Sequence, residues 1–235
     1  MHARFTSLAV SACLAGLCSA GAALAGEGPF SANVSITSDY TYRGISQTNQ
    51  RPALQGGFDY AHDSGFYAGI WGSNVSWLSD ADPDVSNSLE LDVYAGYAGE
   101  IGPLGYDVGL LQYYYPGKYP SGFTKPHTLE GYVGLSWEFL SFKYSHAFTN
   151  LFGFDKSRGS QYYELGFEYP LTDSLMLDAH YGYQRIRNAD SYSDWKLGVT
   201  QGLGGFDIGL HYVDTDIRHD KLAKERIVLS VSRAF

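Results

Sequence analysis

Cysteine is nearly absent from this chain, and the two that occur, Cys13 and Cys18, both lie in a short apolar segment near the amino terminus. Beyond that segment no run of about 18 apolar residues occurs, which excludes a membrane-spanning helix there. Basic residues are also scarce, with 16 Lys and Arg against 25 Asp and Glu and a formal net charge of −9. Nucleic-acid phosphates need a basic surface, so this charge argues against a nucleic-acid partner.

The first 25 residues have the pattern of a secretory signal peptide. Arg4 precedes an apolar run from Leu8 to Ala22, and Ala23-Leu24-Ala25 supplies the small residues that signal peptidase requires. We expect cleavage after Ala25, with Gly26 as the first mature residue, so that residues 26–235 form the single domain of the mature protein. A membrane anchor and a lipoprotein acylated at Cys13 are the alternatives. Cleavage removes both cysteines, which excludes disulfides and Cys-ligated metal from the product.

The composition is otherwise dominated by 20 Tyr and 28 Gly. Dyad alternation runs from Phe30 to Arg43, where one face is apolar with aromatic ends and the other is polar. Side chains of a strand point alternately to opposite faces, so this period of two indicates strands, while the helical spacing of three and four is absent. Aromatic-flanked apolar strips are what lipid-facing strands need.

The same alternation recurs through the chain, and turn residues separate its repeats. The expected fold is therefore all-β, a transmembrane antiparallel up-and-down β-barrel of about twelve strands. A soluble β-sandwich is the alternative, although it does not need aromatic-flanked strips. The expected strands are 30–43, 53–62, 66–77, 89–98, 106–115, 127–137, 140–149, 161–169, 175–185, 194–201, 206–214 and 224–235.

The expected connections alternate in length. Short turns such as 63–65 and 138–139 are interleaved with longer segments such as 44–52, 78–88 and 116–126. Short periplasmic turns and long outer loops are typical of bacterial outer-membrane barrels. We therefore expect a Gram-negative outer-membrane location in contact with lipid and lipopolysaccharide, with both termini on the periplasmic side.

The chain ends on Phe235 after Ile227, Leu229 and Val231 at alternate positions. This end resembles the carboxy-terminal signal that the barrel assembly machinery recognises. Arg233 departs from the pattern, because that position usually carries an apolar or aromatic residue, but its side chain can reach the interface.

Four segments of the sequence resemble a known family. Ser38-Asp39-Tyr40-Thr41-Tyr42-Arg43-Gly44-Ile45-Ser46-Gln47-Thr48, followed by the segment 52–57, is similar to the TorF family of outer-membrane porins, also called Gcw_chp. The segments 65–75 and 106–117 are similar to later blocks of the same family. The resemblance implies an exported barrel with a pore, and it brings neither an established solute nor catalytic residues.

If the apolar faces meet lipid, the polar faces line the lumen. Acids exceed bases on those faces by about ten to four, which favours the admission of cations. In the alternative, these charges pair across a plugged lumen that conducts nothing. The expected pore-lining residues are Asp39, Arg43, Glu90, Asp92, Asp107, Glu130, Glu164, Asp178 and Lys196; further inward charges are Asp59, Lys143, Glu168, Asp207 and Arg226.

Three motifs carry further hypotheses. Asp39 and Arg43, four residues apart, are expected to form a structural or gating pair that, with Gly44 and Gln47, fixes the first outer loop. The run 80–84, Asp-Ala-Asp-Pro-Asp, offers oxygens for Ca²⁺ or for bridging lipopolysaccharide, but it fails the EF-hand pattern, so a solvated loop is favoured. Asp178-x-His180 suggests part of a catalytic triad, with Ser136 or Ser145 as nucleophile, but nothing brings a serine close to the imidazole.

The function predicted from the sequence is passive diffusion of small hydrophilic solutes or cations through an outer-membrane channel, without cofactor, metal or catalytic residues. The main alternative is a closed structural or adhesion barrel whose outer loops contact surface partners. A lipid- or peptide-hydrolysing barrel enzyme is the third.

Overall fold

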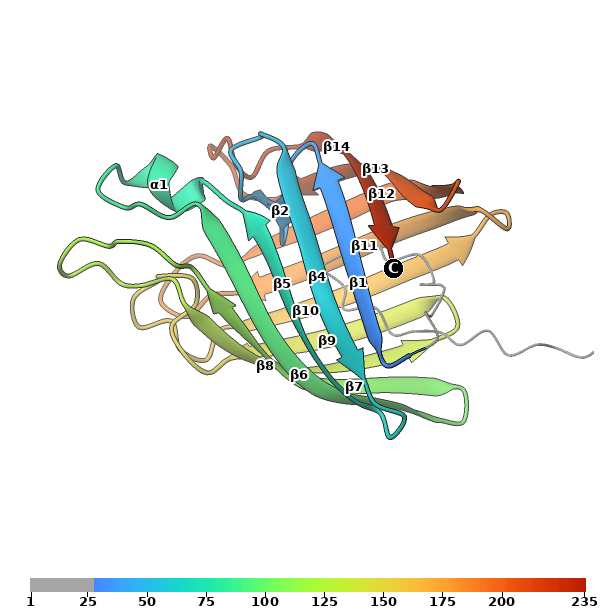
Figure 1. The fold of residues 1–235 in the computed structure, drawn as a ribbon. Coiled ribbons are helices and arrows are strands. Elements are labelled where there is room, and N and C mark those ends of the chain that lie inside the picture. The colour runs from blue at the N-terminus through green and yellow to red at the C-terminus, as the bar shows by residue number, and fades with distance from the viewer. Residues whose placement is uncertain (1–27) are drawn as a thin grey trace, which may run out of the picture.

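The computed structural model describes residues 28–235, and the expected cleavage site at Ala25 and Gly26 lies outside the described residues. Twelve antiparallel strands close into one barrel, as the alternation predicted. Each strand pairs with its sequence neighbours, and β1 closes the barrel against the last strand (Figure 1). The barrel strands are β1 Phe30–Thr37, β4 Ala53–Ala61, β5 Phe66–Asn74, β6 Leu89–Ile101, β7 Leu104–Tyr114, β8 Thr128–Trp137, β9 Leu140–Ala147, β10 Gln161–Pro170, β11 Leu175–Arg185, β12 Tyr192–Leu203, β13 Phe206–Thr215 and β14 Arg226–Ala234.

Three short elements lie outside the barrel wall. β2 (Thr41–Tyr42) pairs with β3 (Ile45–Ser46), and α1 (Trp77–Ala81) forms part of the connection between β5 and β6. α1 was not expected from the sequence. No helix among residues 28–235 is long and apolar enough to cross a membrane.

The expected first strand, 30–43, is too long. β1 ends at Thr37, and the chain then turns into the barrel interior instead of continuing up the wall. The alternation continues past Thr37, but Tyr40 is buried, and its hydroxyl donates to Glu90 Oε1 at 3.1 Å. An interior hydrogen bond together with aromatic packing therefore outweighs a place in the wall. The segment 44–52, expected as an outer loop, is correspondingly folded partly inward.

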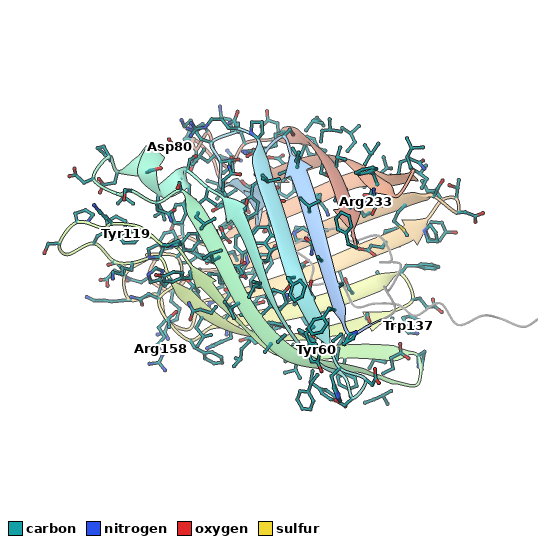
Figure 2. All side chains as sticks on the ribbon, in the orientation of Figure 1. Tyr60, Asp80, Tyr119, Trp137, Arg158 and Arg233 are labelled. Atoms are coloured by element: carbon teal, nitrogen blue, oxygen red, sulfur yellow. The ribbon has the colours of Figure 1, made fainter. Side chains whose placement is uncertain are left out.

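The outward faces of the strands form an apolar band. Ile36, Leu54, Ile70, Val93 and Leu197 are among the large hydrophobic side chains exposed around the barrel. Aromatic side chains flank this band at both ends, as at the two interfaces of a membrane. Tyr60 and Trp137 lie toward the end with short turns (Figure 2). The exposed side chains of Tyr114, Phe148 and Tyr183 lie toward the end with long loops.

The carboxy terminus completes the barrel closure. Phe235 N donates to Ala32 O at 2.8 Å, and Ala32 N donates to Phe235 O at 3.1 Å. Phe235 is exposed on the outer surface, and the Arg233 guanidinium lies 5.2 Å from the centre of its ring. The departure at Arg233 is therefore accommodated by cation–π contacts with Phe235 and Phe206.

Candidate functional site: the barrel lumen

A small hairpin, β2 and β3, projects into the lumen near the loop end. Its turn consists of Arg43 and Gly44, with φ of 47° and 79°. Two successive positive φ values characterise the type I′ turn, which favours glycine at its second central position. A Cβ on Gly44 would lie 2.4 Å from Thr215 Cγ2 and 2.7 Å from Asp194 Cβ, so the hairpin tip touches β13 and β12.

Arg43 anchors the hairpin to the wall. Its Nη1 and Nη2 donate to the two carboxylate oxygens of Glu130 on β8 at 3.1 and 2.7 Å, and Nη1 also donates to Gln184 on β11 at 2.6 Å. The guanidinium carbon lies 4.1 Å from the ring centre of Tyr162. These contacts supply the bidentate partner and ring face that a buried guanidinium favours.

Asp39 holds the base of the hairpin, and it does not pair with Arg43 as the sequence suggested. Asp39 Oδ1 accepts from Ser46 Oγ at 2.5 Å and from Thr48 Oγ1 at 3.0 Å, and its Oδ2 accepts from Arg226 Nη1 at 2.8 Å. The Arg43–Gly44 turn reverses the chain, so the two side chains reach different walls. The expectation of an Asp39–Arg43 pair was wrong.

One half of the lumen is packed with aromatic side chains. Tyr40, Tyr113, Tyr115 and Tyr132 are buried there with Trp71 and several aliphatic residues. Tyr42 OH and Tyr113 OH lie 2.6 Å apart, which joins the hairpin to β7. The hairpin and these aromatics together fill the space beneath β4 to β8.

Four of the expected pore-lining acids lie in this aromatic half. Glu90, Asp92 and Glu130 are almost completely buried, with exposed fractions of 1%, 0% and 2%. Asp107 accepts from Tyr67 OH at 2.6 Å. All four point inward, but they lie behind aromatic side chains and not on the wall of the cavity described next.

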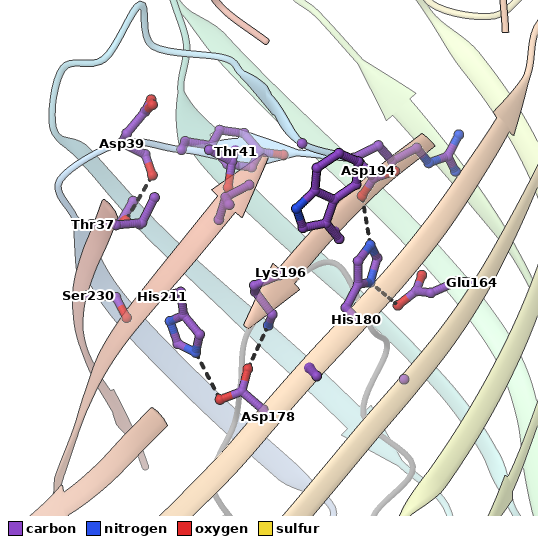
Figure 3. Close-up of a pocket in the computed structure, with 18 of the residues that line it drawn as sticks. Thr37, Asp39, Thr41, Glu164, Asp178, His180, Asp194, Lys196, His211 and Ser230 are labelled. Atoms are coloured by element: carbon purple, nitrogen blue, oxygen red, sulfur yellow. Dashed lines mark hydrogen bonds and ion pairs between the residues drawn. The ribbon is translucent and has the colours of Figure 1, made fainter. Parts of the chain in front are cut away.

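The other half of the lumen contains a cavity of about 210 Å³. Its wall runs along β10 from Glu164 to Glu168 and along β14 from Val228 to Ser232, and Thr41 and Arg43 of the hairpin border it (Figure 3). Five carboxylates line it against two permanently charged bases: Asp39, Glu164, Glu168, Asp178 and Asp194, with Arg43 and Lys196.

Two ion-pair networks cross the cavity wall. His180 bridges two acids, with Nδ1 3.2 Å from Glu164 Oε1 and Nε2 2.7 Å from Asp194 Oδ1 (Figure 3). Asp178 is held by Lys196 Nζ at 3.0 Å and by His211 Nε2 at 2.9 Å. Glu168 differs from these acids, because it is exposed and has no basic side chain within ion-pair distance in the described part of the chain.

Asp39, Arg43, Glu164, Asp178 and Lys196 are thus the expected pore-lining residues that border the cavity. The sequence prediction missed Asp194 and His211. Both carried a signal, since each lies on the polar face of its strand. The sequence pattern of a single strand does not show which residues of other strands these side chains contact.

The catalytic and metal-binding motifs take other roles. Asp178 and His180 contact different partners and do not form the pair that a triad requires. Asp80 is hydrogen-bonded to Ser76 and Arg51 and holds the β5–β6 connection against the first loop. Within residues 28–235, no group of three or more His, Cys, Asp or Glu side chains is placed to hold a metal ion.

A closed, antiparallel twelve-strand barrel with an apolar exterior and a polar interior has the architecture of an outer-membrane β-barrel protein. The chain belongs to the family described as "Bacterial protein of unknown function (Gcw_chp)", whose model matches residues 21–235. No curated protein matches it.

Solved porin structures share this fold. The KdgM porin aligns with a TM-score of 0.59 at 8% identity, covering 87% of this chain and 99% of its own. The NanC porin aligns with a TM-score of 0.52 at 12% identity, covering 87% and 98%. An outer membrane channel from Pseudomonas putida aligns with a TM-score of 0.52 at 12% identity, covering 91% and 97%.

Proposed function

We propose that this protein is an outer-membrane channel for passive diffusion of small hydrophilic solutes, and that it prefers cations. The observation that carries the proposal is the carboxylate-lined cavity inside a barrel whose outer surface is apolar. A polar lumen surrounded by a lipid-facing band provides a route for solutes that the bilayer itself excludes.

The preference for cations rests on the charges of the cavity wall. Fixed negative charges in a narrow, low-dielectric passage attract cations and repel anions. Lys196 compensates Asp178, but Glu168 has no such partner among residues 28–235. Glu168 therefore offers an uncompensated charge on the side of the cavity nearer the short turns.

The size limit rests on the hairpin. Arg43 reaches Glu130 on β8 across the lumen, and aromatic side chains fill half of the interior. The free passage is therefore confined to the side of β9 to β14. One KdgM structure is a complex with oligogalacturonate, a polycarboxylate. The acidic wall here disfavours such polyanions, so we propose small neutral or cationic solutes instead.

We extend the proposal to orientation and assembly. The long loops would face the exterior and both termini the periplasm, as the alternation of connection lengths favours. The expected signal peptide, residues 1–25, would direct export, and Phe235 would be recognised by the barrel assembly machinery.

Single-channel recording in planar bilayers tests the channel. We expect defined conductance steps that are small for a barrel of this size, because the hairpin narrows the lumen. The contact of Arg43 with Glu130 across the lumen favours a second candidate, a closed structural barrel. Purified, correctly folded protein that stays silent in the bilayer would establish the closed barrel and refute the channel.

A further inference from the structure

A hollow on the outside of the barrel gathers basic side chains at the loop end. Lys156, Arg158, Arg185 and Arg187 line it together with His146, Phe148 and Gln161. They come from β9, β10 and β11, from the β9–β10 connection and from the start of the β11–β12 connection. We call this set the basic hollow. Arg158 projects from the loop end of the barrel, far from Trp137 at the opposite end (Figure 2).

The four cations of the basic hollow lack acidic partners. All four are exposed, and none has a carboxylate within 4.0 Å among residues 28–235. Asp155 is the neighbouring acid in sequence, and its backbone carbonyl accepts from Asn188. Four like charges gathered on a protein with net charge −9 repel one another unless an anion lies between them.

The hollow is built by specific backbone contacts. Gly159 has φ of +85°, and a Cβ there would lie 3.1 Å from Arg187 Nη1, so the guanidinium packs directly on the glycine. Arg187 N donates to Ser160 Oγ at 3.0 Å, and Arg185 Nη1 donates to Gln161 Oε1 at 3.3 Å. These contacts hold the guanidinium groups of Arg185 and Arg187 on the wall of the same hollow.

Aromatic side chains next to the basic hollow indicate its level relative to the membrane. Tyr163 on β10 pairs in register with Tyr144 on β9 and Tyr183 on β11, and these outward side chains lie just below the hollow. Phe142 and Leu165 follow on the same faces, toward the middle of the barrel. Aromatic belts lie at the level of lipid headgroups, so the four cations lie at the level of headgroup phosphates.

We propose that the basic hollow binds the phosphate groups of lipopolysaccharide in the outer leaflet. Arg158 and Arg187 would donate to phosphate oxygens, Lys156 would add charge, and acyl chains would lie along Phe142 and Leu165. The paired N–H donors of a guanidinium group match the geometry of phosphate oxygens. This match favours a phosphate as the ligand over a sugar without an anionic group. The site rests on the proposed orientation, in which the long loops face the cell exterior.

The test compares two triple variants of the folded barrel in detergent. Lys156→Gln/Arg158→Gln/Arg187→Gln removes three charges from the hollow. Arg218→Gln/Lys221→Gln/Lys224→Gln removes three exposed charges from the β13–β14 loop as the matched control. Folding of both variants is checked by their heat-modifiable migration on gels, and binding is measured by native mass spectrometry and thermophoresis. The probes are rough lipopolysaccharide, the same lipid without its phosphates, phosphatidylglycerol and inorganic phosphate.

We expect the hollow variant to bind lipopolysaccharide at least about tenfold more weakly, since charge-assisted contacts to phosphate are lost, and the control to match the unmodified protein. Removal of the lipid phosphates should weaken binding to a similar extent, and inorganic phosphate should bind only weakly. Equal binding by both variants would overturn the site. Phosphatidylglycerol bound as tightly as lipopolysaccharide would show a general anionic-lipid site and overturn the assignment. Conductance of the same samples is a separate readout, so a silent barrel that still binds lipopolysaccharide refutes only the channel.

Discussion

Arg43 and Glu130 form a bidentate ion pair across the inside of the barrel, with side chains only 6% and 3% exposed. The pair joins the tip of an inward hairpin to β8, 87 residues further along the chain. Breaking a buried pair from one side leaves an uncompensated charge and costs about 3–5 kcal/mol. The pair is therefore a main contact that holds the hairpin against the wall.

The first prediction concerns this pair. In Arg43→Gln the hairpin loses its anchor, and we expect larger and more frequent conductance fluctuations and a free energy of unfolding lower by about 3–5 kcal/mol. The double variant Arg43→Gln/Glu130→Gln removes both charges and should recover most of that stability. Equal destabilisation of the single and double variants in urea titrations would show that the pair does not act as a unit.

The second prediction concerns the hairpin tip. Gly44→Val places a side chain where even a Cβ would lie 2.4 Å from Thr215 Cγ2, at a φ of +79° that β-branched residues avoid. We expect the hairpin to leave its position and the single-channel conductance to rise. Gly102→Val is the control, because its φ is also positive at +62° but nothing lies within 4 Å of its Cβ. An unchanged conductance in Gly44→Val alongside intact folding would contradict the role of the hairpin as a constriction.

The third prediction concerns the effect of low pH on the connection between β5 and β6. The hydrogen bond from Ser76, with further hydrogen bonds from Asn49 and Arg51, lowers the pKa of Asp80 below its ordinary 3.8, although burial acts in the opposite direction. Because the pKa of Asp80 is lower in the folded state, its ionised form stabilises the folded loop at pH values above the pKa of the unfolded state. This stabilisation is lost as the pH falls through the pKa of the folded state. We expect proteolysis of the 75–88 connection to increase at pH values below the unfolded pKa. Asp80→Asn should be equally sensitive at pH 7 and in acid; retained pH dependence in Asp80→Asn would assign the effect to another group.

Most of the barrel wall was predictable because the alternation of apolar and polar residues within a strand shows by itself which face meets lipid. Leu91 and Val93 alternate with Glu90 and Asp92, and this pattern needs no knowledge of neighbouring strands. The alternation therefore predicted all twelve strands, with ends differing by a few residues except in the first strand, which ends at Thr37 and not at residue 43.

The interior was less predictable for a physical reason. Tyr40 and Tyr42 match an interfacial girdle by sequence, yet their hydroxyls reach Glu90 and Tyr113 inside the barrel. A tyrosine suits either place, because its ring is apolar and its hydroxyl needs a partner. Only the closed fold brings Glu130 or Gln184 to Arg43, so the choice depends on contacts across the lumen.

The fourth prediction concerns topology. Single cysteines at Asp84, Ser121 and Asp190 lie on exposed loop positions, and cysteines at Ser64 and Asp173 lie on exposed short turns. We expect an impermeant maleimide to label the first three on intact cells and the last two only after permeabilisation. Residues 28–235 contain no native thiol that would compete. Labelling in the reverse order would place the long loops in the periplasm and would remove the lipopolysaccharide site from the outer leaflet.

The central claim is a cation-preferring passage along the acidic half of the lumen, and the reversal potential in a KCl gradient tests it most directly. We expect K⁺ to be preferred over Cl⁻, with the preference fading toward 1 M salt, where the Debye length falls to about 3 Å. Glu168→Gln should reduce the preference, since Glu168 is the exposed carboxylate of the cavity wall, whereas Glu225→Gln in an outer loop should not. A reversal potential that shows preference for Cl⁻ in the unmodified protein would contradict the account.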